Sequence, residues 1–344
     1  MNISILGAGA WGTALAIAVS RQHQVMLWGR DSAVMHHMQA QRENTKRLPV
    51  MRLPDALALT ADLTQALTHA KQGLLILATS VAGLRPTLQS MHAHPLPNVV
   101  WLCKGVETQT NLLPHQIVQQ ELGDQIACGA LSGPSFAQEV AAGLPCALTI
   151  GSLHAQLREQ VVAAVHGGSI RVYSTDDVIG VEVGGAVKNI LAIATGITDG
   201  LGLGLNARAA LITRGLAEIV RLGVAMGGRA ETFMGLTGMG DLILTCTGDL
   251  SRNRRVGLQL AEGKSLSTIT ADLGHVAEGM HSVQAIMQLA QTYKIDMPIV
   301  DAVARVLFQG DSPKQMVQRL LAREARDEAN YSIVNKLYGE LVSP

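Results

Sequence analysis

A glycine-rich turn near the start of the chain restricts the fold more than any other feature of the sequence. The apolar run Ile3–Leu6 leads directly into Gly7-Ala8-Gly9-Ala10-Trp11-Gly12, and a helical segment follows. In this setting Gly7 permits a tight turn, Gly9 lets the backbone approach a pyrophosphate, and Gly12 lets the helix pack closely on the strand. Amide groups at the start of the helix attract phosphates. The sequence therefore predicts a dinucleotide-binding unit at the N-terminus.

Short apolar runs alternate with helical segments over the first half of the chain, which indicates a parallel sheet covered by helices on both faces. The expected strands are Ile3–Leu6, Val25–Trp28, Leu74–Ala78, Val99–Cys103, Ala147–Ile150 and Ile170–Tyr173. After Asp176 the chain reads as almost wholly helical, with a helix capped by Asn206 and another starting at Ser312-Pro313. We expect an α/β Rossmann-type doubly wound domain over residues 1–177, followed by an all-α domain over residues 178–344.

Length and composition narrow the class of protein. With 344 residues the chain exceeds the size at which single cores stop growing, roughly 250–300 residues. Lys plus Arg and Asp plus Glu number 27 each, so no basic field exists for a nucleic-acid backbone. Four widely spaced cysteines without a C-x-x-C pair argue against a disulfide framework or a metal site, and they fit a reducing cytoplasm. The uncharged run Ile3–Ser20 lacks the basic start of a signal peptide, so we expect it to be folded.

The end of the second expected strand bears on the choice of dinucleotide. Sites that prefer NAD usually place a carboxylate there, which binds the ribose 2′-hydroxyl. This chain instead has Gly29, which removes bulk, and Arg30, whose guanidinium suits a 2′-phosphate, while Asp31 comes one or two positions late. We expect NADP(H) to be favoured, with NAD(H) as the alternative. A solvated Arg30 without a role is the competing interpretation.

Four further segments carry candidate chemistry. Lys104 follows the end of an expected strand, and Ser132-Gly133-Pro134-Ser135 forms a turn on the same side of the sheet, where ligands of such sheets bind. Lys188 lies in a small, apolar helical stretch, although a lone lysine on a helix is usually a surface residue. Asp241 follows a glycine-rich segment. Ser251-Arg252-Asn253 starts a helix, where basic residues suggest an anionic ligand or a solvated arginine cluster.

Together these segments resemble the soluble bacterial NAD(P)-dependent glycerol-3-phosphate dehydrogenases, in family order from Ile3 to about Gly310. The matching segments are G-A-G-A-W-G-T-A-L, the Lys104 strand end, S-G-P-S-F-A, E-V-G-G-A-V-K-N, T-G-M-G-D-L and S-R-N-R. The resemblance implies a Rossmann domain followed by a helical substrate domain. It implies a cytoplasmic enzyme that interconverts glycerone phosphate and sn-glycerol 3-phosphate by hydride transfer and supplies glycerophospholipid synthesis.

The resemblance also implies roles for individual residues. Lys188 matches the family's proton-transfer lysine. Substrate contacts are implied at Lys104, Gly133, Ser135, Lys188, Asp241, Ser251, Arg252 and Asn253. Besides Gly7, Gly9 and Gly12, cofactor contacts are implied at Ala10, Trp11, Arg30, Lys104, Ala137, Arg252, Val276 and Glu278. Asn189 and Thr245 are weaker candidates. Two positions depart from the family pattern, since Ala10 replaces a hydroxyl residue and Gly248 a common serine.

Two other functions compete with this one. A dehydrogenase of 3-hydroxy acids or sugar acids would explain the first half of the chain but not the cluster Ser251–Arg255. A redox sensor that only binds the dinucleotide would need neither a buried lysine nor a phosphate clamp. We expect a small phosphorylated three-carbon substrate, no nucleic-acid partner and no stable membrane insertion. The oligomeric state stays open, with a homodimer compatible with the sequence.

The first prediction concerns Arg30. Replacing it in Arg30→Ala should weaken NADPH binding roughly 10–150-fold, the equivalent of about 1.5–3 kcal/mol for hydrogen bonds to a charged group. NADH, which has no 2′-phosphate, should lose much less affinity and serves as the internal control. Titration of both cofactors against wild type and variant measures the effect. Equal losses for the two cofactors would show that Arg30 does not contact the 2′-phosphate.

Overall fold

The computed structural model describes residues 1–273 and 277–323. The chain forms two compact units, Met1–Gly185 and Ala186–Pro344. The division falls inside the long helix α8 (Val178–Gly200), whereas the sequence placed the domain boundary just before this helix. Val276 and the charged tail after Arg323 lie outside the described residues.

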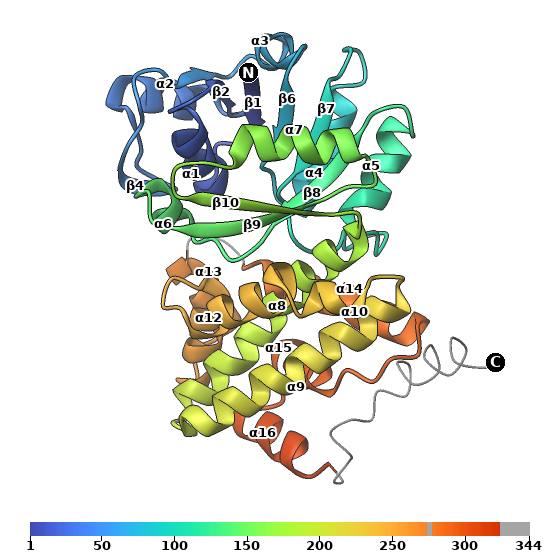
Figure 1. Cartoon of the computed structure of the whole chain (residues 1–344). Helices are drawn as coiled ribbons and strands as arrows, with labels where there is room; N and C mark the ends of the chain where they lie inside the picture. The colour runs from blue at the N-terminus through green and yellow to red at the C-terminus, as the bar shows by residue number, and fades with distance from the viewer. Residues whose placement is uncertain (274–276, 324–344) are drawn as a thin grey trace, which may run out of the picture. The chain divides into compact units, whose positions relative to one another are not determined.

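The first unit is built on an eight-stranded sheet with the order β10-β9-β8-β7-β6-β1-β2-β5 (Figure 1). Its strands are β1 (Asn2–Leu6), β2 (Gln24–Trp28), β5 (Ala58–Thr60), β6 (Leu74–Leu77), β7 (Asn98–Trp101), β8 (Cys128–Ser132), β9 (Cys146–Gly151) and β10 (Ile170–Thr175). A separate hairpin pairs β3 (Glu43–Asn44) with β4 (Leu48–Arg52). Each of the six strands expected from the sequence is present within one to three residues.

The expectation of a wholly parallel sheet was wrong at one place, because β8 and β9 pair antiparallel. A parallel partner would need a crossover that returns the chain along the full strand. The only helix between the two strands, α6 (Ala137–Ala141), has five residues and is too short for that return. Strand β8 itself was not expected from the sequence, because Gly129 and other small residues weaken its strand pattern.

Strand residues alternate between two hydrophobic cores, one on each face of this sheet. In β1, Ile3 and Ile5 belong to the first core, while Leu6 belongs to the second and Ser4 hydrogen-bonds to Ala66 on that side. The first core contains residues of α1 (Ala10–Val19), α2 (Ser32–Gln41), α6 and α7 (Ala155–Val165). The second contains residues of α3 (Leu63–Ala70), α4 (Val81–Ser90), α5 (Pro114–Leu122) and the start of α8. Helices on both faces confirm the doubly wound Rossmann-type fold.

Two apolar segments that could suggest a membrane are part of these cores. The run Ile3–Ser20 forms β1 and α1, and most of its side chains are buried. Among the described residues, α8 is the one helix long and apolar enough to cross a membrane by length and composition. However, 89% of its most apolar window is buried inside the protein, as in the core helix of a globular fold.

The second unit is helical, as expected. After α8 it contains α9 (Gly204–Ala225), α10 (Ala230–Phe233), the π-helical turn η1 (Leu236–Gly240), α11 (Asp241–Thr247), α12 (Arg252–Ala261), α13 (Leu266–Leu273), α14 (Glu278–Thr292), α15 (Pro298–Phe308) and α16 (Pro313–Leu321). Ser312 caps α16 as predicted. Asn206 does not cap α9, because Gly202 and Gly204 turn the chain with positive φ and the helix begins earlier.

Helices α8 and α12 touch through their backbones. A Cβ on Gly196 would lie 2.1 Å from the carbonyl oxygen of Arg254, and a Cβ on Gly257 would lie 2.1 Å from that of Ile193. Only glycine at these two positions permits such a close approach. The contact holds the start of α12 against α8.

A buried carboxyl joins α9 to α15. Glu218 is 1% exposed and accepts hydrogen bonds from the amides of Ile299 (2.7 Å) and Val300 (3.2 Å) in the first turn of α15. Burial raises its pKa to about 8, although the two amides and the nearby Arg221 favour the charged form and Asp296 opposes it.

Because the pKa of Glu218 is raised in the folded protein, we expect the stability of the fold to depend on pH. The pKa of Glu218 is higher in the folded protein, about 8, than its ordinary value of 4.5, so its contribution is full below pH 4.5 and is lost as the pH rises through 8. Glu218→Gln removes this titration. The melting temperature of wild type minus that of Glu218→Gln should therefore fall between pH 5 and pH 9. A difference that stays constant with pH would contradict the raised pKa.

Candidate active site

The glycine-rich turn connects β1 to α1, as predicted, and two of its glycines are required by backbone packing. Gly7 has φ +130°, and a Cβ there would lie 2.5 Å from the carbonyl oxygen of Ala78 after β6. A Cβ on Gly12 would lie 2.1 Å from the carbonyl oxygen of Gly7. Helix α1 begins at Ala10, so the end of the glycine-rich segment forms the first turn of the helix.

The second glycine faces open space. A Cβ on Gly9 would meet no atom within 4 Å, so the protein's own packing does not require glycine there. Gly9 is the N-cap of α1, where it has no side chain to cap the helix, and Ala10 and Trp11 are only partly buried. Open space in front of a helix N-terminus fits a dinucleotide pyrophosphate, which the backbone amides and the helix dipole would stabilise.

A buried asparagine that the sequence analysis missed supports this turn. Asn44 in the β3–β4 hairpin is 1% exposed, and its Nδ2 donates to the carbonyl oxygen of Ala8 (3.0 Å) and to Oγ1 of Thr13 (2.8 Å). One side chain therefore links the hairpin to both the turn and α1. A lone asparagine between short strands has no sequence signal for this role, because its partners lie more than 30 positions away.

The structure separates the two charged residues after β2. The Oδ1 of Asp31 accepts the amide of Val34 at 3.1 Å and caps α2, which explains why this carboxylate follows late after the strand. Arg30 is exposed and forms no hydrogen bond or ion pair with the other described residues. At Gly29 a Cβ would lie 2.4 Å from the sulfur of Met35, so a larger side chain there would have to displace Met35.

Three predicted substrate residues of the first unit meet at one carbonyl. The carbonyl oxygen of Gly133 accepts from Nζ of Lys104 (3.1 Å) and from Oγ of Ser135 (3.1 Å). Gly133 has φ +144°, and a Cβ there would lie 2.7 Å from the carbonyl oxygen of Ala147, so the turn requires glycine. Ala137 starts α6 two residues after Ser135 and packs against the first core.

A buried carboxylate of the first unit, Glu182, belongs to the family motif E-V-G-G-A-V-K-N, in which the sequence analysis gave it no role. Glu182 on α8 accepts from Nε1 of Trp101 (2.9 Å) and from the amide of His115 (2.9 Å), and it lies 2.5 Å from Nδ1 of His115. Burial lowers the pKa of His115, but the hydrogen bond that its Nδ1 donates to Glu182 and the negative charge of that carboxylate together outweigh burial, so the net shift is upward. Glu182 thus connects α8 to β7 and α5.

In the second unit Lys188 is buried and paired. Its side chain is 8% exposed, and Nζ donates to Oδ1 of Asp241 (2.5 Å) and to Oγ1 of Thr245 (3.0 Å). Asp241 is the first residue of α11 and follows the π-helical turn η1, a type of turn frequent at functional sites. The alternative of a surface lysine was wrong, because the side chain is buried and paired with Asp241, which lies 53 positions later in the chain.

The start of α12 matches the prediction closely. Ser251 is the N-cap and accepts the amide of Arg254, and Arg252 and Asn253 form the first turn. Arg252 is exposed, whereas the guanidinium of Arg254 donates to Asp199 (2.9 Å) and Asp249 (3.0 Å). Arg254 is therefore a structural residue, and the interpretation of the whole cluster as solvated arginines was wrong.

Helix α14 begins beside these residues. Oδ1 of Asn253 accepts the amide of Gly279 at 3.0 Å, and Nδ2 of Asn189 donates to Oε2 of Glu278 at 3.2 Å. A Cβ on Gly279 would lie 2.7 Å from the carbonyl oxygen of Asn189, directly after Lys188. The second unit thus brings Asn189, the neighbour of Lys188, together with Asn253 and Glu278, while Val276 lies outside the described residues.

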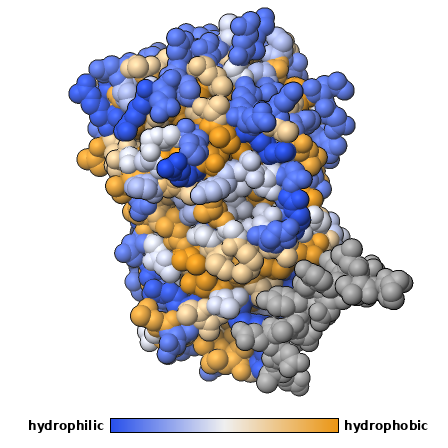
Figure 2. Space-filling view, in the orientation of Figure 1, coloured by the Kyte–Doolittle hydropathy of each residue, from blue (hydrophilic) through white to orange (hydrophobic). Residues whose placement is uncertain are grey.

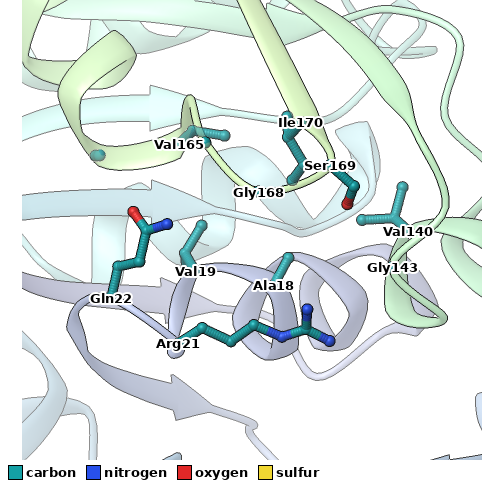
Figure 3. A pocket seen from close by; sticks show the side chains of 12 residues that line it. Ala18, Val19, Arg21, Gln22, Val140, Gly143, Val165, Gly168, Ser169 and Ile170 are labelled. Carbon is teal, nitrogen blue, oxygen red and sulfur yellow. The ribbon is translucent and has the colours of Figure 1, made fainter.

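The first unit also has a pocket at the C-terminal end of α1, the end opposite to the glycine-rich turn (Figure 3). It is lined by the last residues of α1, α6 and α7 and by the turn that includes Gly168 and Ser169. Helix C-termini carry partial negative charge, which repels phosphates. The Arg21 guanidinium lies near Gly143, just after α6, where it compensates part of this charge. The pocket therefore does not suit a phosphorylated ligand.

No other cluster in the described part of the chain suggests different chemistry. Within residues 1–273 and 277–323, no group of three or more His, Cys, Asp or Glu side chains could hold a metal ion. All four cysteines are free thiols, two of them buried. Burial raises the pKa of Cys128 to about 11 and that of Cys246 to about 12, so neither is a nucleophile at neutral pH.

Comparison with known proteins agrees with this arrangement. Family models described as NAD-dependent glycerol-3-phosphate dehydrogenase N-terminus and C-terminus match residues 2–158 and 177–318. The glycerol-3-phosphate dehydrogenase (NAD(P)+) of Janthinobacterium sp. (strain Marseille) is 69% identical over 329 residues, covering 95% of this chain and 99% of the relative. That of Herminiimonas arsenicoxydans is 68% identical over 329 residues, with the same coverage.

A solved structure supports the same conclusion. The crystal structure of glycerol-3-phosphate dehydrogenase from Coxiella burnetii superposes with a TM-score of 0.89 at 42% identity, covering 93% of this chain and 98% of that one. Both family models, the sequence relatives and this structure carry the same enzyme name. The chain belongs to the NAD-dependent glycerol-3-phosphate dehydrogenase family.

Proposed function

We propose that the chain interconverts glycerone phosphate and sn-glycerol 3-phosphate with Lys188 as the proton-transfer residue. As a member of its family it is an NAD(P)-dependent oxidoreductase that acts on a small phosphorylated substrate. The observation that carries the assignment of roles is the buried Lys188–Asp241–Thr245 cluster in the same unit as the basic first turn of α12. A protein that only binds the dinucleotide would have no use for either feature.

The reaction needs a proton at the substrate oxygen. When bound, the nicotinamide exchanges a hydride with C2 of the three-carbon substrate. During reduction Nζ of Lys188 donates a proton to the carbonyl oxygen, and during oxidation it takes the proton back. Asp241 and Thr245 hold Nζ in place from one side, and Asp241 balances its charge. General acid–base help of this kind is typically worth about 10²–10⁴ in rate.

The two ends of the substrate would be bound by different groups. Arg252 and the amide nitrogen of Asn253 contact the phosphoryl group, because Oδ1 of Asn253 is engaged with Gly279 and leaves the nitrogen as the donor. Ser251 and the helix N-terminus support them. In the first unit, substrate contacts are proposed at Lys104, Gly133 and Ser135. The first unit would be the dinucleotide-binding domain, and the helical unit would be the substrate domain.

The cofactor would lie against the glycine-rich turn. Gly7, Gly9 and Gly12 shape the turn, Ala10 and Trp11 contact the cofactor at the start of α1, and the exposed Arg30 binds a 2′-phosphate, which favours NADP(H) over NAD(H). Further cofactor contacts are proposed at Lys104, Ala137, Arg252, Val276 and Glu278. For Glu278 the hydrogen bond from Asn189 supports a fixed orientation.

Location and assembly are predictions of the same kind. Four free cysteines fit the cytoplasm, and a balanced charge fits a protein without a nucleic-acid partner. Apolar and polar side chains both reach the surface drawn in Figure 2. Exposed large apolar residues of the second unit, such as Leu203, Leu205 and Ile243, offer surface for the homodimer that the sequence left open.

One assay tests the function directly. Purified protein should oxidise NADPH with glycerone phosphate and reduce NADP+ with sn-glycerol 3-phosphate. Absorbance at the nicotinamide band follows both directions. If the protein binds NADPH but reduces a 3-oxo acid and not glycerone phosphate, it belongs to the competing class of 3-hydroxy-acid dehydrogenases.

Replacing the lysine tests its catalytic role. Lys188→Ala should lower kcat by about 10²–10⁴, because the proton donor is gone, while NADPH still binds. Removing one partner of a buried ion pair also destabilises a protein, so Lys188→Ala/Asp241→Asn serves as the matched variant without a buried unpaired charge. NADPH fluorescence and melting temperature report binding and folding. A folded variant with near-normal kcat would end the assignment.

Replacing the arginine tests phosphate binding. Hydrogen bonds to charged groups are worth roughly 1.5–3 kcal/mol, so Arg252→Ala should lower kcat/KM for glycerone phosphate about 10–150-fold. The residual reaction with unphosphorylated dihydroxyacetone should change far less. Arg255→Ala, on the next exposed arginine of α12, is the control. Equal losses with both substrates would show that Arg252 has another role.

A further inference from the structure

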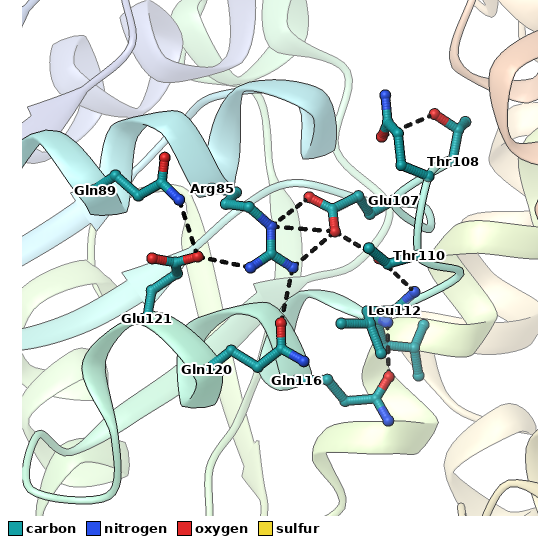
Figure 4. A network of polar contacts seen from close by, with 11 residues as sticks. Arg85, Gln89, Glu107, Thr108, Thr110, Leu112, Gln116, Gln120 and Glu121 are labelled. Carbon is teal, nitrogen blue, oxygen red and sulfur yellow. Dashed lines mark hydrogen bonds and ion pairs between the residues drawn. The ribbon is translucent and has the colours of Figure 1, made fainter.

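A polar network in the first unit joins α4 to the loop that follows Lys104 (Figure 4). Arg85 of α4 forms a two-bond pair with Glu107, with Nε 2.9 Å from Oε1 and Nη2 2.8 Å from Oε2. Its Nη1 donates to Oε1 of Glu121 on α5 at 2.6 Å. One guanidinium therefore connects the loop to two helices.

Glu107 also organises the loop itself. Its Oε2 accepts from Oγ1 of Thr110 at 2.5 Å, its amide donates to the carbonyl oxygen of Leu112, and its carbonyl accepts the amide of Asn111 at 2.8 Å. Glu107 is 6% exposed. The hydrogen bond from Arg85 lowers its pKa below the ordinary value, so the carboxylate stays charged at neutral pH.

Lys104 lies directly before this loop. Its Nζ reaches the carbonyl oxygen of Gly133, and its side-chain stem passes within van der Waals distance of the position a Cβ of Gly185 would occupy. Gly105 follows with φ +131°, so the chain turns sharply between Lys104 and Glu107. No helix or strand covers residues 102–113, and fixing such backbone costs conformational entropy.

We propose that Glu107 is a positioning residue, held by Arg85, which fixes the loop Gly105–Leu113 and so places the ammonium of Lys104 for the phosphorylated substrate. The proposal rests on the proposed substrate role of Lys104. Binding energy is gained when a charged donor is oriented before the ligand arrives, since less freedom is lost on binding. Glu107 would therefore affect substrate binding without touching substrate.

The network contains its own matched control. Glu121 is the other carboxylate to which Arg85 donates a hydrogen bond, but it belongs to α5 and not to the loop. Glu107→Gln leaves the Arg85–Glu121 pair, and Glu121→Gln leaves the Arg85–Glu107 pair. A purely structural network would make the two variants alike, whereas a positioning role makes them differ in substrate KM.

The experiment compares KM for glycerone phosphate, kcat, NADPH Kd and melting temperature in both variants. Glu107→Gln should raise KM about tenfold, the equivalent of roughly 1.4 kcal/mol, with a smaller change in NADPH Kd. Glu121→Gln should lower the melting temperature to a similar extent but leave KM within about twofold of wild type. If Glu107→Gln does not fold, Thr110→Val, which removes one bond to Glu107 and keeps the Arg85 pair, should still raise KM.

A double variant tests whether Glu107 acts through Lys104. If Glu107 acts through Lys104, then Lys104→Ala/Glu107→Gln should have the KM of Lys104→Ala alone. Multiplying effects in the double variant, or equal KM values for Glu107→Gln and Glu121→Gln, would overturn the positioning role. An unchanged KM in Lys104→Ala would instead overturn the substrate role of Lys104, and the inference with it.

Discussion

Direct contact of backbone with backbone, possible only at glycine, is the constraint on which both units depend. In the first unit Gly7 and Gly12 bring the turn after β1 against Ala78, and the start of α1 is held there as a result. In the second unit Gly196 and Gly257 bring α12 against α8. Any larger side chain at these positions would push a helix N-terminus away from its place. Both of these N-termini are proposed to bind phosphate groups.

Paired charges at buried or half-buried side chains are the second common feature of the two units. Lys188 is paired with Asp241, Arg254 with Asp199, and Arg85 with Glu107. A buried ion pair adds little to stability on its own, because removing two charges from water costs about as much as their attraction returns. What such pairs provide is a fixed geometry. In this protein each pair fixes a segment next to a proposed substrate residue, which is where geometry matters for catalysis.

The same side chains show why a motif does not assign roles by itself. In Ser251-Arg252-Asn253-Arg254, alternate residues diverge: Arg252 is exposed, while Arg254 is turned inward to Asp199 and Asp249. Asn253 uses its oxygen for the start of α14 and leaves only its nitrogen for a ligand. Neighbouring residues of one helix turn thus divide into structural and ligand-binding groups according to the direction of each side chain.

Local patterns in the sequence determined much of this protein. The turn Gly7–Gly12, the buried strands, the Ser251 and Ser312 caps and the family motifs depend on residues close together in the chain, so their physical meaning can be read directly. The link from Asn44 to Ala8, the antiparallel pairing of β8 with β9 and the Arg85–Glu107 pair could not be read in this way. Each joins segments that are distant in sequence, and short strands such as β5 carry too few residues for a periodic signal. Only the packing of helices and strands decides which distant side chains meet, because that choice depends on the burial of the whole core and not on any one segment.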